Sequence, residues 1–220
     1  MAAGRSFAQP GMIRDLAHYG SFDAPLTLDY DYVVIDVETT GFEPSKGARV
    51  IEFGAHRTRG DGEVVESFST LINHGSSDTG AEFIHGISSD MLRGAPTFME
   101  VWPAIQSIMS NAIVVAHNAA FDMSFMASEI NIAGQSMQTI PGLCTYWLAR
   151  QAFPDSPNHK LSTIAETLGV VNDQEHDAAA DAMVVVKALP FMFAQIEPVK
   201  HHIEPGVRIK MPANIPTKHR

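Results

Sequence analysis

Three apolar segments in close succession constrain the fold of this chain most. Residues 30–36 (YDYVVID), 49–58 (RVIEFGAHRT) and 63–72 (EVVESFSTLI) are rich in the β-branched and aromatic residues that favour strands. The polar run RGDGE separates the second segment from the third, as a hairpin turn does. The pattern therefore predicts three consecutive strands, with a hairpin between the second and the third.

Helical segments follow this opening and alternate with two further strands. The predicted strands are residues 112–116 and 138–143, and SSDMLRG predicts a short helical turn. Apolar residues recur at helical spacing in segments 96–110, 119–131, 145–152, 160–168 and 178–193, the first of them interrupted by a proline near its start. Strands that come first and helices that cover them predict an α/β fold, a mixed five-stranded sheet flanked by helices.

One domain with two appendages accounts for the length of the chain. We expect an N-terminal extension at residues 1–29, a domain at residues 30–195 and a flexible, proline-containing basic tail at residues 196–220. The single cysteine, Cys144, permits neither an internal disulfide nor a cysteine zinc site. No apolar run approaches the roughly 20 residues that a bilayer requires, and the opening residues lack the apolar core of a leader. The expectation is a cytoplasmic protein that does not enter a membrane.

The charge of the chain restricts how it can bind nucleic acid. The formal net charge is −10, and the tail from residue 199 onward carries five basic residues against one acidic residue, or about +4. The preceding residues therefore carry −14, which excludes a broad basic face for a duplex. Such a body can hold one strand end if bound cations neutralise a cluster of carboxylates. The acidic residues must then supply that cluster.

Asp36 and Glu38 lie two residues apart at the end of the first predicted strand, so their side chains share one face. A carboxylate at the end of a buried apolar strand is costly unless a cation or hydrogen-bond donors compensate it. The alternative is a strand that simply runs out into the polar turn at Thr39, Thr40 and Gly41. The residues alone leave both interpretations open.

Asp122 falls in the first turn of the helix that follows strand 112–116, where the helix dipole favours negative charge. Acids are common in first turns for this local reason, so the position by itself is weak evidence of a site. Asn118 is a plausible N-cap of the same helix.

Asp181 projects from the second turn of the helix predicted at residues 178–193, and the short alanine side chains around it allow the helix to pack close to the sheet. Asp177 is its natural N-cap, and His176 precedes the helix on a segment free to point into a cleft. The alternative is an alanine-rich helix that carries one solvated acid.

Four carboxylates without thiolates favour hard cations such as Mg²⁺ or Mn²⁺, and they suit two such ions, which can cleave a phosphodiester together. Histidine exchanges protons near neutral pH and can accept a proton from the attacking water. The spacing H-x4-D occurs twice, as His117 with Asp122 and as His176 with Asp181. Spacing alone does not choose the base.

The three acidic segments, in this order, resemble the motifs of the DEDDh exonucleases, the family that includes the proofreading epsilon subunit of bacterial DNA polymerase III. DVETTGF, VVAHNAAFDMSFM and HDAAADA are similar to its first, second and third motifs and span about residues 30–193. The resemblance implies a ribonuclease H-like fold, release of 5′-mononucleotides from a 3′ end, and His176 as the general base. It implies metal binding by four acids: Asp36, Glu38, Asp122 and Asp181.

Weaker matches extend the resemblance to the nucleotide pocket. IHGISSDML is similar to the family's HGI segment, which implies that His85 approaches the terminal nucleotide. Thr39, Phe42, Asn118 and Phe121 would line the pocket, although both aromatic residues could equally belong to the core. In LCTYWLAR, Cys144 stands where many relatives carry an aspartate; that acid is not a ligand, so we expect activity to survive.

Three functions stay open at this point. The epsilon-like segments favour a DNA-directed exonuclease of the proofreading or repair type, acting on a single-stranded 3′ end with a DNA polymerase subunit as a possible partner. Relatives with the same five residues trim RNA or degrade oligoribonucleotides, and no residue here reads a 2′-hydroxyl. A non-catalytic binding module is the third interpretation, and the presence of all five residues counts against it. The basic tail would contact a partner or nucleic acid, or only aid solubility.

Overall fold

The computed structural model describes the chain except for residues 1–11, 16–20, 26–29, 136–140, 173–174 and 196–220. Its strands are β1 (Met12–Asp15), β2 (Ser21–Pro25), β3 (Asp31–Thr39), β4 (Val50–Arg59), β5 (Val64–Leu71), β6 (Ile113–Ala116) and β7 (Pro141–Cys144). Its helices are η1 (Pro44–Lys46), α2 (Glu82–His85), α3 (Ser89–Arg93), α4 (Phe98–Met109), α5 (Ala119–Ile132), α6 (Thr145–Ala152), α7 (Leu161–Leu168) and α8 (Ala178–Gln195).

One mixed sheet organises these elements, in the order β2-β1-β7-β6-β3-β4-β5. Strands β3, β4 and β5 form the predicted antiparallel meander, and β6 and β7 are added parallel to β3. These five strands confirm the predicted fold class. β1 and β2, which the sequence does not predict, extend the sheet beyond β7: β1 pairs antiparallel with β7, and β2 pairs antiparallel with β1. The boundaries of the extension and the domain stay predictions, and the basic tail lies outside the described residues.

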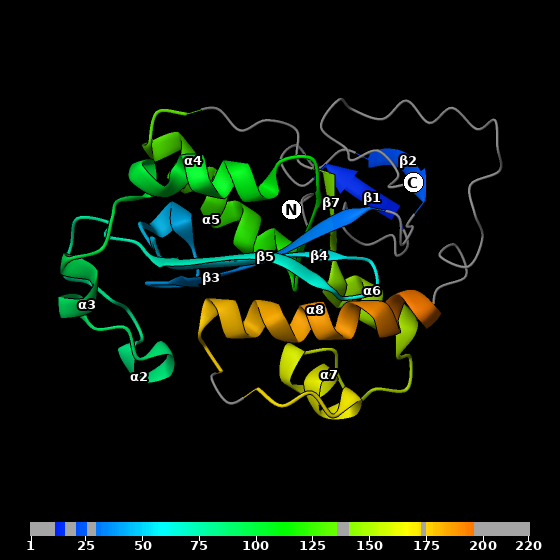
Figure 1. The fold of residues 1–220 in the computed structure, drawn as a ribbon. Helices are drawn as coiled ribbons and strands as arrows, with labels where there is room; N and C mark the ends of the chain where they lie inside the picture. The colour runs from blue at the N-terminus through cyan, green and yellow to red at the C-terminus, as the bar shows by residue number, and fades with distance from the viewer. Residues whose placement is uncertain (1–11, 16–20, 26–29, 136–140, 173–174, 196–220) are drawn as a thin grey trace.

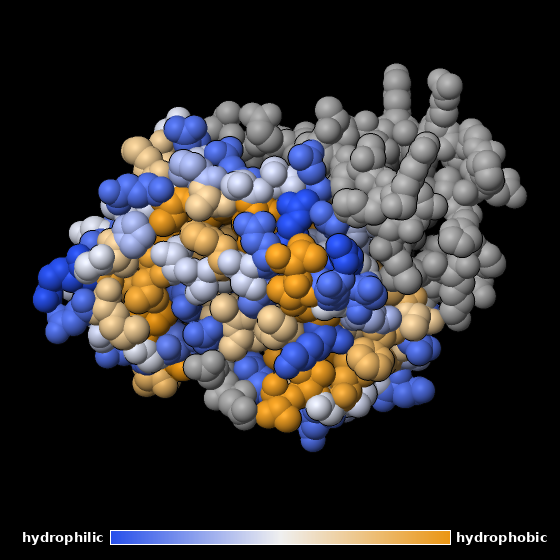
Figure 2. All heavy atoms as spheres, in the orientation of Figure 1, coloured by the Kyte–Doolittle hydropathy of each residue, from blue (hydrophilic) through white to orange (hydrophobic). Residues whose placement is uncertain are grey.

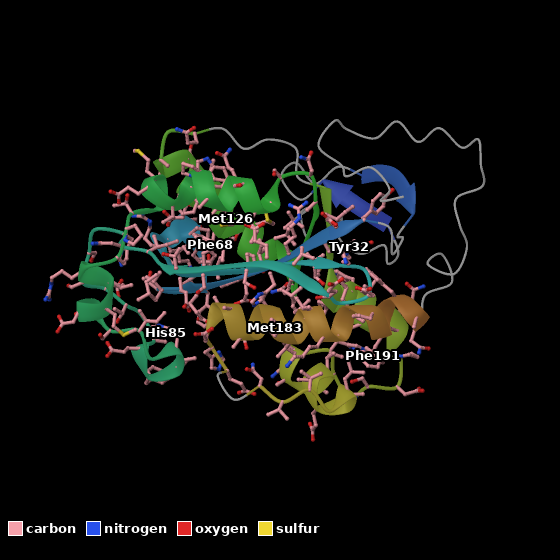
Figure 3. The ribbon with its side chains drawn as sticks, viewed as in Figure 1. Tyr32, Phe68, His85, Met126, Met183 and Phe191 are labelled. Atoms are coloured by element: carbon pink, nitrogen blue, oxygen red, sulfur yellow. The ribbon has the colours of Figure 1, made fainter. Side chains whose placement is uncertain are left out.

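Helices cover both faces of the sheet (Figure 1), with α4 and α5 on one side and α8, backed by α7, on the other. Val33, Ile35 and Val37 of β3 face the core beneath α4 and α5, whereas Tyr32 and Val34 face the core beneath α8. Figure 3 shows the same division, with Phe68 and Met126 above the sheet and Met183 on α8 below it. The alternation of β3 therefore decides which side chains face α8.

The helix α8 is long and apolar enough to cross a bilayer by length and composition, alone among the helices of the described residues. Half of that stretch is buried within the protein, and Val185, Val186, Leu189 and Phe193 belong to the core beneath the sheet. Burial of this kind is typical of a core helix. On the face shown in Figure 2, apolar side chains gather over α7 and hydrophilic ones over α3.

A buried ion pair ties α5 to the start of β4. The carboxylate of Glu129, which is 1% exposed, accepts hydrogen bonds from Nε of Arg49 at 2.7 Å, Nη2 of Arg49 at 2.8 Å and the Val50 N–H at 3.1 Å. We expect Glu129→Ala to lower the free energy of unfolding by about 3 kcal/mol, because it leaves a guanidinium and an amide without their acceptor. Urea unfolding measures this loss.

The exposed pair of Glu43 with Lys46 provides the matched control. Glu43→Ala should change the free energy of unfolding by less than about 0.5 kcal/mol, because solvent screens exposed pairs. Equal losses in the two variants would show that the buried pair does not hold α5 in place.

Candidate active site

Asp36 and Glu38 lie on the face of β3 that α8 covers. Residues 33, 35 and 37 fill the opposite core, so the strand alternation directs both carboxylates the same way. In the antiparallel register, Asp36 lies opposite Gly54 of β4, and Glu38 lies opposite Glu52. The first acidic pair is therefore part of the layer between the sheet and α8.

Asp122 reaches the same end of the sheet from a different element. It is the fourth residue of α5, which begins directly after β6, and β6 runs parallel to β3. The carboxyl ends of the two strands therefore meet at one edge. Asp122 is 2% exposed, and the Val37 N–H donates a hydrogen bond to its carboxylate.

Asp181 enters the site from α8, at the end of the first helical turn and not in the second turn as predicted, because the helix begins at Ala178. Asp177 caps this helix as predicted, since its Oδ1 accepts a hydrogen bond of 2.9 Å from the Ala180 N–H. His176 is exposed and has a left-handed backbone with φ 67°. One ligand atom each of Glu38, His176 and Asp181 lies within 4.8 Å of the others.

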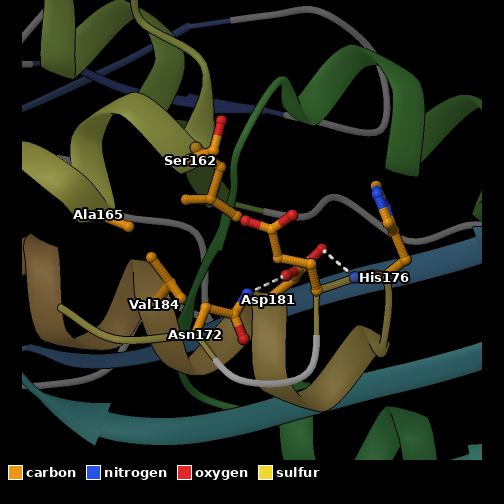
Figure 4. A pocket seen from close by; sticks show the side chains of 8 residues that line it. Ser162, Ala165, Asn172, His176, Asp181 and Val184 are labelled. Atoms are coloured by element: carbon orange, nitrogen blue, oxygen red, sulfur yellow. Dashed lines mark hydrogen bonds between the residues drawn. The ribbon is translucent and has the colours of Figure 1, made fainter.

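Asp181 is oriented through both of its oxygens. Nδ2 of Asn172 donates to Oδ1 at 2.6 Å, and the His176 N–H donates to Oδ2 at 3.4 Å (Figure 4). These residues line a pocket of about 230 Å³ between α7 and α8, together with Leu161, Ser162, Ala165, Glu175 and Val184. Sequence reasoning missed Asn172, because its place beside Asp181 depends on how α7 and α8 pack.

Burial raises the pKa values of all four acids, and the charges of neighbouring acids add to the rise for Asp36 and Glu38. Burial, and then the charges of Asp122, Asp181 and Glu38, hold the pKa of Asp36 well above its ordinary value. Burial and the charge of Asp181 raise the pKa of Glu38 from 4.5 to about 8. Burial raises the pKa of Asp122 to about 7 and also raises that of Asp181. In the cation-free protein the charged forms of these carboxylates are therefore disfavoured.

This donor set fits divalent cations. None of the ion pairs formed by the described residues involves Asp36, Glu38, Asp122 or Asp181. Buried carboxylates without basic partners are costly, and hard cations with oxygen preference relieve that cost. The arrangement is thus suited to bind Mg²⁺ or Mn²⁺, with His176 beside Glu38 and Asp181.

The raised pKa values predict an unusual pH dependence of stability when a chelator removes divalent cations. The folded protein holds protons on Glu38 and Asp122 that the unfolded chain has already lost, so the free energy of unfolding falls as pH rises through about 7 to about 8. His117, whose pKa is lowered from 6.5 to about 4 by burial, has the opposite effect only below about pH 6.5. Thermal unfolding measured between about pH 6.5 and pH 8.5 therefore reports the effect of the acids without that of His117.

Two additions sharpen this measurement. Glu38→Gln should remove the pH dependence between about pH 7 and pH 8, because Glu38 no longer titrates there and the pKa of Asp122 is about 7. Mn²⁺ at 100 times its Kd should restore about 2.7 kcal/mol at the upper pH, because it binds only the folded chain. A free energy of unfolding that stays level or rises over this interval would contradict the charge cluster.

The two histidines of the H-x4-D segments have different surroundings. His117 is largely buried, its Nδ1 contacts the Thr145 hydroxyl at 3.1 Å, and its Nε2 donates to the His159 carbonyl at 2.9 Å. Both ring nitrogens are therefore occupied. His176 is exposed beside the acids, which favours it as the base. Its role stays a prediction.

The residues predicted to line the nucleotide pocket divide into two groups. Phe42 is 86% exposed and so does not belong to the core, whereas Phe121 is half-buried and packs against Phe125 at 4.9 Å between ring centroids. His85 uses Nε2 to contact the Thr79 carbonyl at 3.0 Å and Nδ1 to accept from the Ile87 N–H at 3.0 Å. Both ring nitrogens of His85 therefore already form hydrogen bonds with backbone groups, so a nucleotide would contact the ring by its carbon atoms.

Two smaller polar residues shape the backbone around this pocket. The Thr39 hydroxyl donates to the Gly41 carbonyl at 2.7 Å, within the turn after β3. Asn118 precedes α5 in a left-handed conformation, and its side chain makes no capping hydrogen bond, which corrects the predicted cap. Their roles in binding a nucleotide, like those of Phe42, His85 and Phe121, stay predictions.

A family model described as "Exonuclease" (RNase_T) matches residues 33–189, which include all four acids and His176. The chain belongs to this exonuclease family. The match covers most of β3 through most of α8, so it includes every element that carries one of the four acids of the candidate site.

Two relatives of this exonuclease domain are named as DNA polymerase III proteins, and a third is named as a 3'-5' exonuclease. The chain is 36% identical over 172 residues to a "DNA polymerase III PolC-type" of Clostridium perfringens, covering 78% of this chain and 12% of that protein. It is 36% identical over 154 residues to a "3'-5' exonuclease DinG" of Bacillus subtilis, covering 70% and 16%. It is 35% identical over 161 residues to a "DNA polymerase III subunit epsilon" of Aquifex aeolicus, covering 73% and 79%. The first two relatives are thus far longer than the matched region.

Solved structures share the fold of this exonuclease domain. The nuclease domain of 3'hExo, described as a DEDDh family member bound to rAMP, aligns with a TM-score of 0.65 and 18% identity over 77% of this chain and 94% of that one. Exonuclease I of E. coli, in complex with a dA16 oligonucleotide, aligns with a TM-score of 0.67 and 18% identity over 76% and 41%. These likenesses confirm the ribonuclease H-like α/β architecture.

Proposed function

We propose that this chain is a metal-dependent 3′-to-5′ exonuclease that releases 5′-mononucleotides from nucleic-acid 3′ ends. Asp36, Glu38, Asp122 and Asp181 hold two Mg²⁺ or Mn²⁺ ions, and His176 is the general base. The observation that carries the proposal is the convergence of four acids from β3, α5 and α8, none of which forms an ion pair with lysine or arginine among the described residues. The name of the Bacillus subtilis relative supports the 3′-to-5′ direction.

The residues of the site divide the work of hydrolysis. When bound, divalent cations balance the negative charge on the phosphate and ease deprotonation of the attacking water. Asp36 and Asp122 anchor the site from β3 and α5, while Glu38 and Asp181 lie beside His176. A ring nitrogen of His176 accepts the proton of the attacking water. The proton leaves to solvent, because His176 is exposed.

A single-stranded DNA 3′ end is the substrate we propose. The names of two relatives, a PolC-type polymerase III and an epsilon subunit, support DNA as the substrate and a polymerase as the partner. The exposed ring of Phe42 provides a stacking surface for an end base, worth roughly 1–3 kcal/mol where it forms. The acidic body disfavours a long duplex contact, which suits a site that holds one end.

RNA trimming is the second candidate, favoured by the solved structure of 3'hExo bound to rAMP. Matched DNA and RNA 15-mers of one sequence, labelled at the 5′ end, separate the two candidates. Faster stepwise shortening of DNA supports the first, and faster shortening of RNA replaces it with the second. Shortening of neither strand, with folded protein and saturating Mn²⁺, would favour the non-catalytic binding module.

A further inference from the structure

Three residues on one face of β4 hold the first turn of α8, and none of them belongs to the predicted site. Glu52, Gly54 and His56 alternate along the strand, so all three face the helix. The Ala178 N–H donates to Oε2 of Glu52 at 3.1 Å, and Nε2 of His56 donates to the Ala179 carbonyl at 2.8 Å. A carbonyl oxygen only accepts, so Nε2 of His56 carries the proton.

Gly54 lies between these two contacts and lets the backbones of β4 and α8 approach. A Cβ at this position would lie 2.4 Å from the carbonyl carbon of Ala178 and 2.4 Å from the nitrogen of Ala179. No side chain fits in that space without moving the helix. The backbone from the Ala178 N–H to the Ala179 carbonyl is therefore held by an acceptor at one end, a donor at the other and close packing against Gly54 between them.

The segment held in this way carries two members of the proposed site. His176 lies two residues before Ala178, and Asp181 lies three residues after it, within one helical turn. Glu38, the cross-strand neighbour of Glu52, lies opposite them on β3. Any movement of the first turn of α8 therefore changes the distance between Glu38 and the pair His176 and Asp181.

The presence of an acid at position 52 needs an explanation, because two carboxylates directly opposite each other on neighbouring strands destabilise the strand pair. Glu52 is buried and adds negative charge beside Asp36, Glu38 and Asp181. Its compensation is the N-terminus of α8, where unpaired N–H groups and the helix dipole favour an anion. The cost of the extra acid is thus offset by a contact that fixes α8.

We propose that Glu52 is a positioning residue that acts with Gly54 and His56 to fix the first turn of α8, and thereby places Asp181 and His176 opposite Asp36 and Glu38. The inference rests on the proposed function, because it assigns these residues to the same site. The competing role for Glu52 is that of a further cation ligand, for which its charge would matter and its contact with Ala178 would not.

Two substitutions at Glu52 separate these roles. Glu52→Gln keeps an oxygen that accepts from the Ala178 N–H but removes the charge, whereas Glu52→Ala removes both. We expect Glu52→Ala to lower Mn²⁺ affinity and exonuclease turnover roughly 10- to 100-fold, the range found for outer partners of metal ligands. Glu52→Gln should retain most of the wild-type Mn²⁺ affinity and most of the wild-type turnover. Glu66→Gln, an exposed acid on β5, is the matched control and should leave both unchanged.

Amide hydrogen exchange in cation-free protein gives a readout that does not depend on activity. Exchange at residues 178–182 should accelerate in Glu52→Ala and stay at the wild-type rate in Glu52→Gln. Wild-type behaviour of Glu52→Ala in exchange and Mn²⁺ affinity would overturn the proposal, and so would a Glu52→Gln variant as impaired as Glu52→Ala. Hydrogen exchange at residues 178–182 and Mn²⁺ affinity, measured by calorimetry, do not require catalysis. The test therefore stays valid if the wild-type chain has no exonuclease activity.

A second pair of variants covers the case in which Glu52→Ala fails to fold. His56→Gln retains an N–H donor near the position of Nε2, whereas His56→Ala removes it. The proposal predicts faster exchange at residues 178–182 and weaker Mn²⁺ binding in His56→Ala, with recovery in His56→Gln. Equal behaviour of these two variants would overturn it.

Discussion

Asp181→Asn is expected to reduce exonuclease turnover by more than roughly 100-fold. Loss of an outer partner of a metal ligand costs up to about 100-fold, and loss of a ligand itself should cost more. The substitution keeps the shape of the side chain and removes the charge that would hold a cation. Folding should persist, because Asp181 is half-buried among like charges that burial already disfavours. Single-turnover digestion at saturating Mg²⁺, with thermal unfolding in parallel, measures both effects.

Asp177→Asn is the matched control for this substitution. Asp177 lies four residues earlier and caps α8 through the Ala180 N–H, and asparagine caps helices as well as aspartate does. Turnover of this variant should stay within a few fold of the wild-type value. If Asp181→Asn retained activity with added Mg²⁺ or Mn²⁺, Asp181 would be an ordinary acid of the helix surface.

His176→Ala is expected to slow the chemical step by roughly 10²- to 10⁴-fold, the usual contribution of a general base. Mn²⁺ affinity should change little, because the carboxylates remain. Single-turnover rates at saturating cation measure the first effect, and calorimetry measures the second. The readouts must be taken together, because a ring nitrogen of His176 also lies within 4.8 Å of ligand atoms of Glu38 and Asp181.

His74→Ala is a suitable control for the loss of an imidazole, since Nε2 of His74 contacts only the Asp78 carbonyl of its own loop. Its turnover should match that of the wild type. A His176→Ala variant that lost Mn²⁺ affinity in proportion to its rate would identify His176 as a cation ligand and leave the base unassigned.

Local sequence patterns predict the strands and helices that carry the site, because strand alternation and small helical side chains each have a direct structural consequence. The alternation in β3 directs Asp36 and Glu38 toward one face, and the alanines of α8 allow that helix to approach β4 at Gly54. The order of strands before helices likewise predicts the five-stranded sheet. Family resemblance, and not spacing, chose His176 over His117, and the buried hydrogen bonds of His117 agree with that choice.

Other features depend on contacts between distant residues, which no local pattern reports. β1 joins the sheet by backbone pairing with β7, and β2 joins it by pairing with β1; neither strand has the periodic sequence that would predict it. Glu52 is an ordinary strand residue until α8 places the Ala178 N–H against it, 126 positions later in the chain. Asn118 resembles an N-cap in sequence but adopts a left-handed backbone without a capping bond.

The most direct test of the central claim compares one single-stranded oligonucleotide labelled at the 5′ end with the same strand labelled at the 3′ end. Each is incubated with Mg²⁺, with Mn²⁺ or with chelator. The account predicts a ladder that shortens stepwise from the 5′-labelled strand, immediate release of a labelled mononucleotide from the 3′-labelled strand, and neither product with chelator. Internal fragments, release from the 5′ end, or equal digestion with chelator would contradict a cation-dependent 3′-to-5′ exonuclease built on Asp36, Glu38, Asp122 and Asp181.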